Sequence, residues 1–121
     1  MSPPSPPPKT ILFAFSGNPL CFVHVLLNAL DLHGRGGEGK IVIEGEATRL
    51  IGEMAADSHF LHALYAEAKG LDLIAAVCRA CATKLGVLEE VKAENLPLGD
   101  DMQGHPSMGR YLAEGYQIIT F

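Results

Sequence analysis

The sequence is short of positive charge, of cysteine and of long apolar runs, and each shortage excludes a class of protein. Nine Lys and Arg residues stand against 14 Asp and Glu residues, giving a formal net charge of −5 without a basic cluster. This balance argues against nucleic acid and membrane surfaces as partners. The longest apolar stretch, residues 20–30, is interrupted by His24 and Asn28 and is too short to cross a membrane. Small molecules and other proteins are the partner classes left.

Three cysteines, an odd number, do not predict a disulfide framework. A chain of 121 residues can bury a core large enough to fold without crosslinks, so reduced thiols are expected. The opening segment MSPPSPPP lacks the basic start and apolar stretch of a secretory signal, which favours a soluble protein of the cytoplasm. We interpret residues 1–9 as a disordered proline-rich tail and residues 10–121 as a single domain.

Apolar runs of strand length alternate with longer helical patterns along the rest of the chain. Strands buried on both faces are predicted over residues 11–15, 40–43, 72–77 and 116–121, because these runs lack polar alternation. A weaker strand is predicted near 95–98, where Pro97 suits a sheet edge. Helices are predicted over 19–33, 48–68 with a break near Asp57, 78–86 and 106–115. This pattern predicts a three-layer α/β/α fold with a mostly parallel sheet of about five strands.

The helix predicted over 19–33 has a single polar stripe, formed by His24, Asn28 and Asp31. A helix that is apolar elsewhere buries more than one face. We therefore expect it to contact a second element or a second subunit, and we expect a homo-oligomer.

Ligands of open α/β sheets bind beyond the carboxyl ends of the strands, where the strand-to-helix loops meet. The residues of these loops are the candidates for an edge pocket: Ser16, Gly17 and Asn18 after the first strand, Glu44 after the second, Cys78 and Cys81 after the third, Asp100 after the weak strand, and His105 ahead of the last helix.

Cys78 is the candidate nucleophile. It is predicted to stand at a helix start, where backbone N–H groups and the helix dipole lower a thiol pKa to about 3.5–7.5. Cys81 lies three residues later and can face it as a Cys-x-x-Cys pair, a spacing that fits disulfide exchange or persulfide relay. The alternative is that both cysteines fill the core. His105 is a candidate general base, or a residue that begins the last helix.

Other motifs have simpler interpretations. Cys21 is expected to fill the core, the alternative being a disulfide with Cys78. The glycine-rich segment 34–39 follows a helix and is predicted to be a turn. His59 and His62 are interpreted as solvated or capping residues. We expect no cofactor and no metal, because zinc requires more ligands than one Cys-x-x-Cys supplies.

The segment VCRACATKLGV, residues 77–87, resembles the DsrE/DsrF-like (DsrEFH-like) proteins of sulfur relay, in which a strand ends in a cysteine and a glycine closes the following short helix. The segments 11–30 and 111–121 are similar as well. The resemblance implies five parallel strands, assembly as a trimer or hexamer, and a cysteine that carries sulfur as a persulfide. Cys78 occupies that position.

These observations lead to a sulfur carrier, or sulfurtransferase subunit, that exchanges sulfur with donor and acceptor proteins. Two alternatives stay open: a dithiol redox protein that uses Cys78 and Cys81, and a noncatalytic oligomeric subunit that binds a small ligand or a protein.

Overall fold

Strands and helices alternate along the chain in the computed structural model, which describes residues 6–121. The elements in chain order are β1 (Lys9–Ala14), α1 (Pro19–Gly34), β2 (Glu38–Ile43), the 3₁₀ helix η1 (Gly45–Arg49), α2 (Leu50–Met54), α3 (His62–Gly70), β3 (Ile74–Cys78), α4 (Arg79–Lys84), α5 (Leu88–Ala93), β4 (Leu98–Gly99), α6 (Met108–Ala113) and β5 (Gln117–Thr120).

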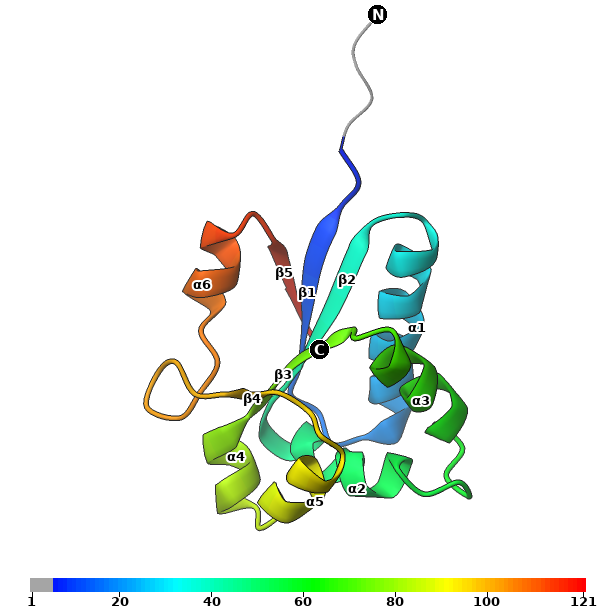
Figure 1. Cartoon of the computed structure of the whole chain (residues 1–121), viewed down its shortest axis with the longest axis vertical. Helices are drawn as coiled ribbons and strands as arrows, with labels where there is room; N and C mark the ends of the chain where they lie inside the picture. Colours follow the sequence, from blue (N-terminus) through cyan, green and yellow to red (C-terminus); the bar gives the residue numbers. More distant parts are fainter. Residues whose placement is uncertain (1–5) are drawn as a thin grey trace, which may run out of the picture.

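The five strands form one parallel sheet in the order β4-β3-β2-β1-β5. Consecutive strands β1 to β4 are neighbours, and the chain then crosses the sheet so that β5 pairs with the other side of β1 (Figure 1). Since all strands run the same way, their carboxyl ends share one edge. The predicted α/β fold with a parallel sheet is confirmed.

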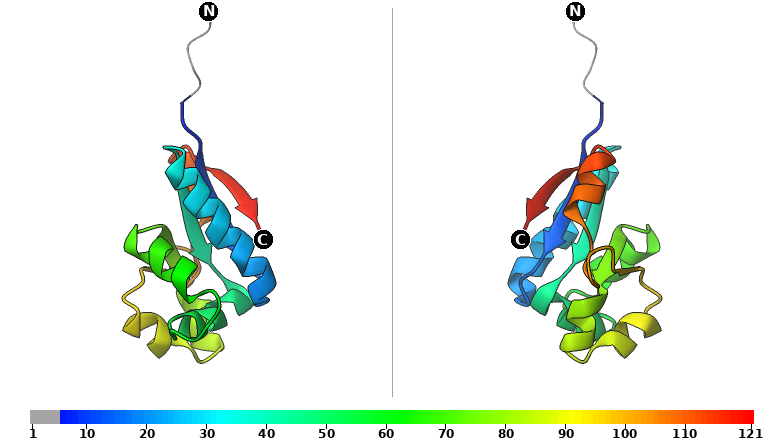
Figure 2. Two further views of the ribbon diagram at one scale, coloured as in Figure 1. Left: turned by 90° about the vertical axis from the view of Figure 1, so that its right-hand side faces the viewer. Right: turned by 90° about the vertical axis from the view of Figure 1, so that its left-hand side faces the viewer.

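Helices cover the two faces of the sheet unequally. The larger core contains Leu12, Ile41 and Val77 and is closed by α1 to α5, whereas the smaller core contains Phe13 and Val42 and is closed by α6. In Figure 2, α1 lies in front of the strands in the left view and α6 lies in front of them in the right view, so the two helices cover opposite faces of the sheet. Side chains of β1 and β2 alternate between these two cores, and β3 contributes side chains to both, which explains why residues 11–14, 41–43 and 74–77 are continuously apolar.

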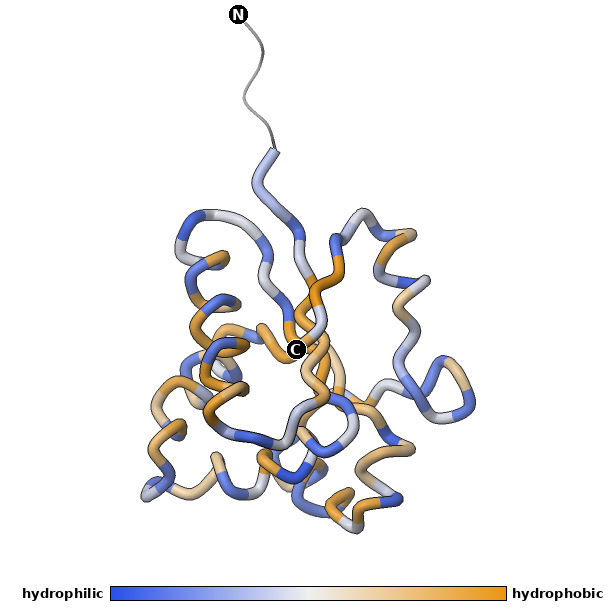
Figure 3. The backbone as a smooth tube through the Cα atoms, turned by 180° about the vertical axis from the view of Figure 1, so that it is seen from behind, coloured by the Kyte–Doolittle hydropathy of each residue, from blue (hydrophilic) through white to orange (hydrophobic). Residues whose placement is uncertain are grey.

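The two edge strands are less buried than the central ones. β4, with two residues, lies at an edge, as Pro97 predicted. The prediction that residues 116–121 form a strand buried on both faces is wrong, because β5 is the other edge and Ile119 is 48% exposed. Figure 3 shows the apolar colour concentrated where the central strands run, while hydrophilic residues gather in the turns and alternate with apolar ones along the helices.

Two helical regions differ from the prediction. The stretch 48–68 is divided into η1, α2 and α3, with turns between α2 and α3 around the predicted break at Asp57. The third helix ends before Gly86, whose φ is +74°, and the chain then forms the unpredicted helix α5. α5 buries Val91, half-buries Leu88 against the core and exposes the acidic pair Glu89 and Glu90, so this short helix has too few apolar residues to give a clear pattern in the sequence.

The amino-terminal tail predicted over residues 1–9 is described in part, since residues 1–5 lie outside the described residues. Residues 6–8 are exposed and have no regular secondary structure, and Lys9 already belongs to β1. Among residues 6–121, no helix combines the length and the apolarity that a membrane span requires.

Helix α1 begins and ends as its sequence predicts. The side chain of Asn18 accepts a hydrogen bond from the Leu20 N–H (2.9 Å), and Pro19 is the first helical residue. Its inner side is buried at Phe22 and its neighbours, while Leu20 and Leu27 are 66% and 47% exposed. A second apolar side of α1 is therefore uncovered within one chain.

Candidate thiol site

Cys78 is both the last residue of β3 and the N-cap of α4. Its backbone is extended (φ −60°, ψ 113°), and its Sγ accepts a hydrogen bond from the Cys81 N–H at 3.3 Å. The predicted position at a helix start is thus confirmed. The same bond brings Cys81 over Cys78, so the Cys-x-x-Cys spacing places both sulfurs at the carboxyl edge of the sheet.

A tight turn carries His105 to this place. Met102 and His105 exchange backbone hydrogen bonds of 2.8 and 2.9 Å, and the central residues Gln103 and Gly104 have φ of +48° and +92°. Two positive φ values are typical of a type I′ turn, which favours glycine. The Gly104 carbonyl also accepts the Ala80 N–H (2.8 Å), and this bond fixes the turn to the first turn of α4.

Two thiols and one imidazole meet at the end of β3. The Cys78 Sγ lies 3.1 Å from the His105 Nδ1, and the Cys81 Sγ lies 3.9 Å from the same nitrogen. The Cys78 thiol is also 3.7 Å from the Gly104 carbonyl, which accepts its hydrogen. A nucleophile within hydrogen-bond reach of a base is the arrangement used in thiol catalysis. Cys78 is fully buried, whereas Cys81 is half-buried.

Glu44 completes the group from the end of β2. The carboxyl group is buried and its Oε1 lies 3.9 Å from the His105 Nδ1. Burial raises the pKa of Glu44, and its contacts with His105 and Cys78 partly oppose that rise. One carboxylate oxygen, two sulfurs and one imidazole nitrogen therefore lie within 4.8 Å of one another. A Cys-x-x-Cys pair alone has too few ligands for a metal, and His105 and Glu44 supply two further donor atoms beside it.

The expected low pKa of Cys78 is wrong. Burial raises the pKa of the Cys78 thiol to about 12, and the neighbouring Cys81 thiol and the Glu44 charge act in the same direction. The Cys81 N–H lowers the pKa by stabilising a thiolate, as expected for a helix start. This single hydrogen bond is outweighed by the loss of solvent around the buried thiol, which raises the pKa. Cys78 is accordingly a protonated thiol at neutral pH and requires a base to become a nucleophile.

The remaining edge residues have local roles. Ser16 accepts the Asn18 N–H (3.2 Å) and Asn18 caps α1, while Gly17 packs against Glu46, where a side chain would meet Glu46 Cβ at 2.9 Å. Asp100 is exposed. The structure therefore unites Cys78, Cys81, Glu44 and His105, whereas Ser16 and Asn18 serve the start of α1.

Three other predictions are compared with the structure here. Cys21 is exposed on α1, so its interpretation as core filler is wrong. His59 and His62 make local contacts: the His59 Nδ1 accepts the Leu61 N–H (3.1 Å), and the half-buried His62 has its Nδ1 2.8 Å from the Met54 carbonyl oxygen. The segment 35–37 is a turn, as predicted for the glycine-rich segment.

Gly104 is a positioning residue that the sequence argument missed. A Cβ at this position would stand 3.0 Å from the Ala80 Cβ, so glycine is needed both for φ and for the close approach to α4. The Gln103-Gly104 pair directly ahead of His105 is the turn signal that could have indicated it.

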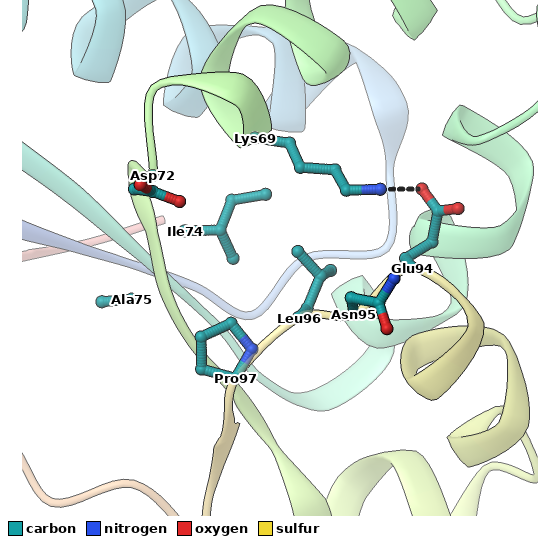
Figure 4. A pocket seen from close by; sticks show the side chains of 8 residues that line it. All are labelled: Lys69, Asp72, Ile74, Ala75, Glu94, Asn95, Leu96 and Pro97. Atoms are coloured by element: carbon teal, nitrogen blue, oxygen red, sulfur yellow. Dashed lines mark hydrogen bonds and ion pairs between the residues drawn. The ribbon is translucent and has the colours of Figure 1, made fainter.

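Solvent reaches the thiol site from the side of Cys81. A cavity of about 270 Å³ is lined by Cys81 together with Gly45, Glu46, Lys84 and Leu85. A cavity of about 440 Å³ lies at the opposite end of β3, where Figure 4 shows Lys69 and Glu94 paired above Ile74 and Leu96. Since β3 runs from Ile74 to Cys78, that cavity is at the amino edge, away from the sulfurs.

Comparison with known proteins places the chain in a family. No family model matches it. It is 39% identical over 97 residues to the uncharacterized protein MJ0733 of Methanocaldococcus jannaschii, covering 80% of this chain and 77% of that protein. The chain belongs to the family of MJ0733. An uncharacterized protein of Archaeoglobus fulgidus is 40% identical over 40 residues, which are 33% of this chain and 66% of that protein.

A solved structure supports the fold. The conserved protein of unknown function BT1422 from Bacteroides thetaiotaomicron superposes with a TM-score of 0.67, covering 93% of this chain and 95% of that chain at 16% identity. At this identity the likeness establishes the α/β fold with its parallel five-stranded sheet.

Proposed function

We propose that this chain is a DsrE/DsrF-like sulfur carrier that takes up sulfane sulfur at Cys81 and holds it as a persulfide on Cys78. The observation that carries the proposal is the meeting of both sulfurs at one imidazole nitrogen, 3.1 and 3.9 Å from the His105 Nδ1. The resemblance of residues 77–87 to sulfur-relay proteins points to the same chemistry.

Exposure divides the work between the two cysteines. Cys81 lines a cavity that is open to solvent, and Cys78 has no exposed surface. A donor persulfide therefore reaches Cys81 first. The Cys81 thiolate attacks the outer sulfur of the donor, a new S–S bond forms, the donor's S–S bond breaks, and the donor leaves as a thiolate.

The second step moves the sulfur inward. Cys78 is protonated at neutral pH because burial raises its pKa to about 12, so a base must accept its proton. In this step the His105 Nδ1, which lies 3.1 Å from the Cys78 Sγ, takes that proton, and the buried Glu44 stabilises the imidazolium that forms. The Cys78 thiolate then attacks the outer sulfur on Cys81, which leaves as a thiolate. An acceptor thiolate reverses these two steps and leaves with the sulfur.

Intact-mass and peptide analysis after incubation with a small persulfide tests this order. Wild-type protein is expected to gain one sulfur, located on Cys78. The Cys78→Ser variant should keep the sulfur on Cys81. The Cys81→Ser variant should take up sulfur slowly, because the thiol of Cys78 is buried. His105→Ala should slow the second step and leave the first. Cys21→Ser, which changes an exposed thiol outside the site, is the matched control. Loading of Cys21 alone would refute the proposal.

A dithiol redox protein is the second candidate, favoured by two sulfurs within 4.8 Å of each other. In this reaction Cys78 and Cys81 lose two protons and two electrons to a disulfide substrate, which is reduced to two thiols. Cys78→Ser separates the two functions, because it abolishes the internal disulfide but leaves persulfide loading at Cys81.

A further inference from the structure

Four side chains of metal-binding type converge at the carboxyl edge of the sheet from three different segments. Glu44 follows β2, Cys78 and Cys81 flank the start of α4, and His105 ends the turn after β4. Their donor atoms all lie within 4.8 Å of one another. Segments so distant in sequence share this spot because parallel strands end at the same edge.

The spacing fits a tetrahedral zinc ion. With Zn–S of about 2.3 Å and Zn–N of about 2.0 Å, tetrahedral angles separate sulfur from nitrogen by about 3.5 Å. The two sulfur-to-nitrogen distances here are 3.1 and 3.9 Å, on either side of that value. The Glu44 Oε1 is 3.9 Å from the same nitrogen, so it needs to approach by a few tenths of an ångström.

The chemistry of the donor set selects the metal. Thiolate and imidazole ligands suit zinc and do not suit magnesium or calcium, which prefer oxygen. The Cys81 N–H that is donated to the Cys78 Sγ provides an outer contact that orients a thiolate ligand.

We infer that Glu44, Cys78, Cys81 and His105 bind one zinc ion when the cysteines are reduced. Binding displaces the two thiol protons to solvent, so the affinity for zinc rises with pH. This inference goes beyond the sulfur-carrier function and does not rest on it. The bound metal occupies both sulfurs, and metal binding and sulfur loading therefore exclude each other.

Cobalt(II) titration of the reduced, metal-free full chain tests the inference. One Co²⁺ per chain is expected, with thiolate-to-metal charge-transfer absorption and the strong visible bands of tetrahedral coordination, and stoichiometric Zn²⁺ should displace it. Loss of an outer-shell partner weakens metal binding by roughly tenfold to hundredfold. Glu44→Gln and His105→Ala change direct ligands, so each should weaken Zn²⁺ binding by at least that factor. The absorption should vanish in the Cys78→Ser, Cys81→Ser double variant.

Cys21→Ser and His24→Ala are the matched controls, since both residues are exposed on α1 and outside the cluster. Absence of charge-transfer absorption, or equal Zn²⁺ affinity in wild type and in both Glu44→Gln and His105→Ala, would overturn the inference. Glu44→Gln preserves side-chain shape, and circular dichroism verifies that each variant is folded.

Sulfur loading measured in excess chelator is independent of the metal result, so the two proposals fail separately. Prior loading with Zn²⁺ should block persulfide formation, and a chelator should restore it.

Discussion

The buried thiol of Cys78 makes a definite prediction about stability at alkaline pH. Its pKa is raised from 9.0 to about 12 in the folded chain, mainly by burial. Above the pKa of the unfolded thiol, the unfolded state loses a proton that the folded state retains. The free energy of unfolding therefore falls as pH rises, and the contribution of Cys78 is fully present below pH 9.

The magnitude follows from the two pKa values. One pH unit of differential ionisation corresponds to about 1.4 kcal/mol. Between about pH 8 and pH 10, an unfolded thiol with a pKa of 9.0 goes from mostly protonated to mostly ionised, so the expected loss is about 1.4 kcal/mol. The pKa values of Tyr65, Tyr111 and Tyr116 are raised from 10.0, mainly by burial, and these groups begin to add to the loss as pH approaches 10. Comparison with a variant that lacks the Cys78 thiol separates its contribution from theirs.

Urea unfolding followed by circular dichroism measures this loss, with reductant and chelator present so that the thiols stay free. Cys78→Ala removes the titrating group. Between pH 8 and pH 10, its free energy of unfolding should fall by about 1.4 kcal/mol less than that of the wild type. Cys21→Ala, at an exposed cysteine, should retain the wild-type dependence. Parallel pH curves for wild type and Cys78→Ala would refute the claim that burial keeps this thiol protonated.

Three further perturbations test other parts of the structure. Gly104→Ala should destabilise the fold by about 1–2 kcal/mol, because φ is +92° and the added methyl group would contact Ala80 too closely. The control Gly70→Ala should not destabilise it, because a Cβ there meets nothing within 4 Å. Equal urea midpoints for the two variants would contradict the turn geometry. Asn18→Ala should cost about 1 kcal/mol through loss of the α1 cap, and an unchanged urea midpoint would contradict that role. We expect a trimer or hexamer in sedimentation equilibrium and dissociation by Leu27→Glu on the exposed side of α1; a monomeric wild type would contradict this.

The central part of the fold was predictable because its signals are local. β1, β2 and β3 each contain a continuous apolar run, and α1 has a cap, an initial proline and a terminal glycine. Such signals arise from neighbouring residues and do not depend on distant contacts. Residues 116–121 predict a strand, but their pattern of apolar residues fits a central strand and an edge strand equally, so the exposed edge position of β5 was not predictable. Edge position is decided by where the crossover returns.

The sequence by itself determined that Cys78 and Cys81 stand at a helix start after a buried strand, because that follows from residues 74–86 alone. The tertiary structure decided what surrounds them: His105 arrives from 27 residues away through the turn at Gly104, and Glu44 arrives from the neighbouring strand. It also decided the direction of the Cys78 pKa shift. The helix start is a local feature that favours a thiolate, whereas burial is produced by the whole fold and outweighs it.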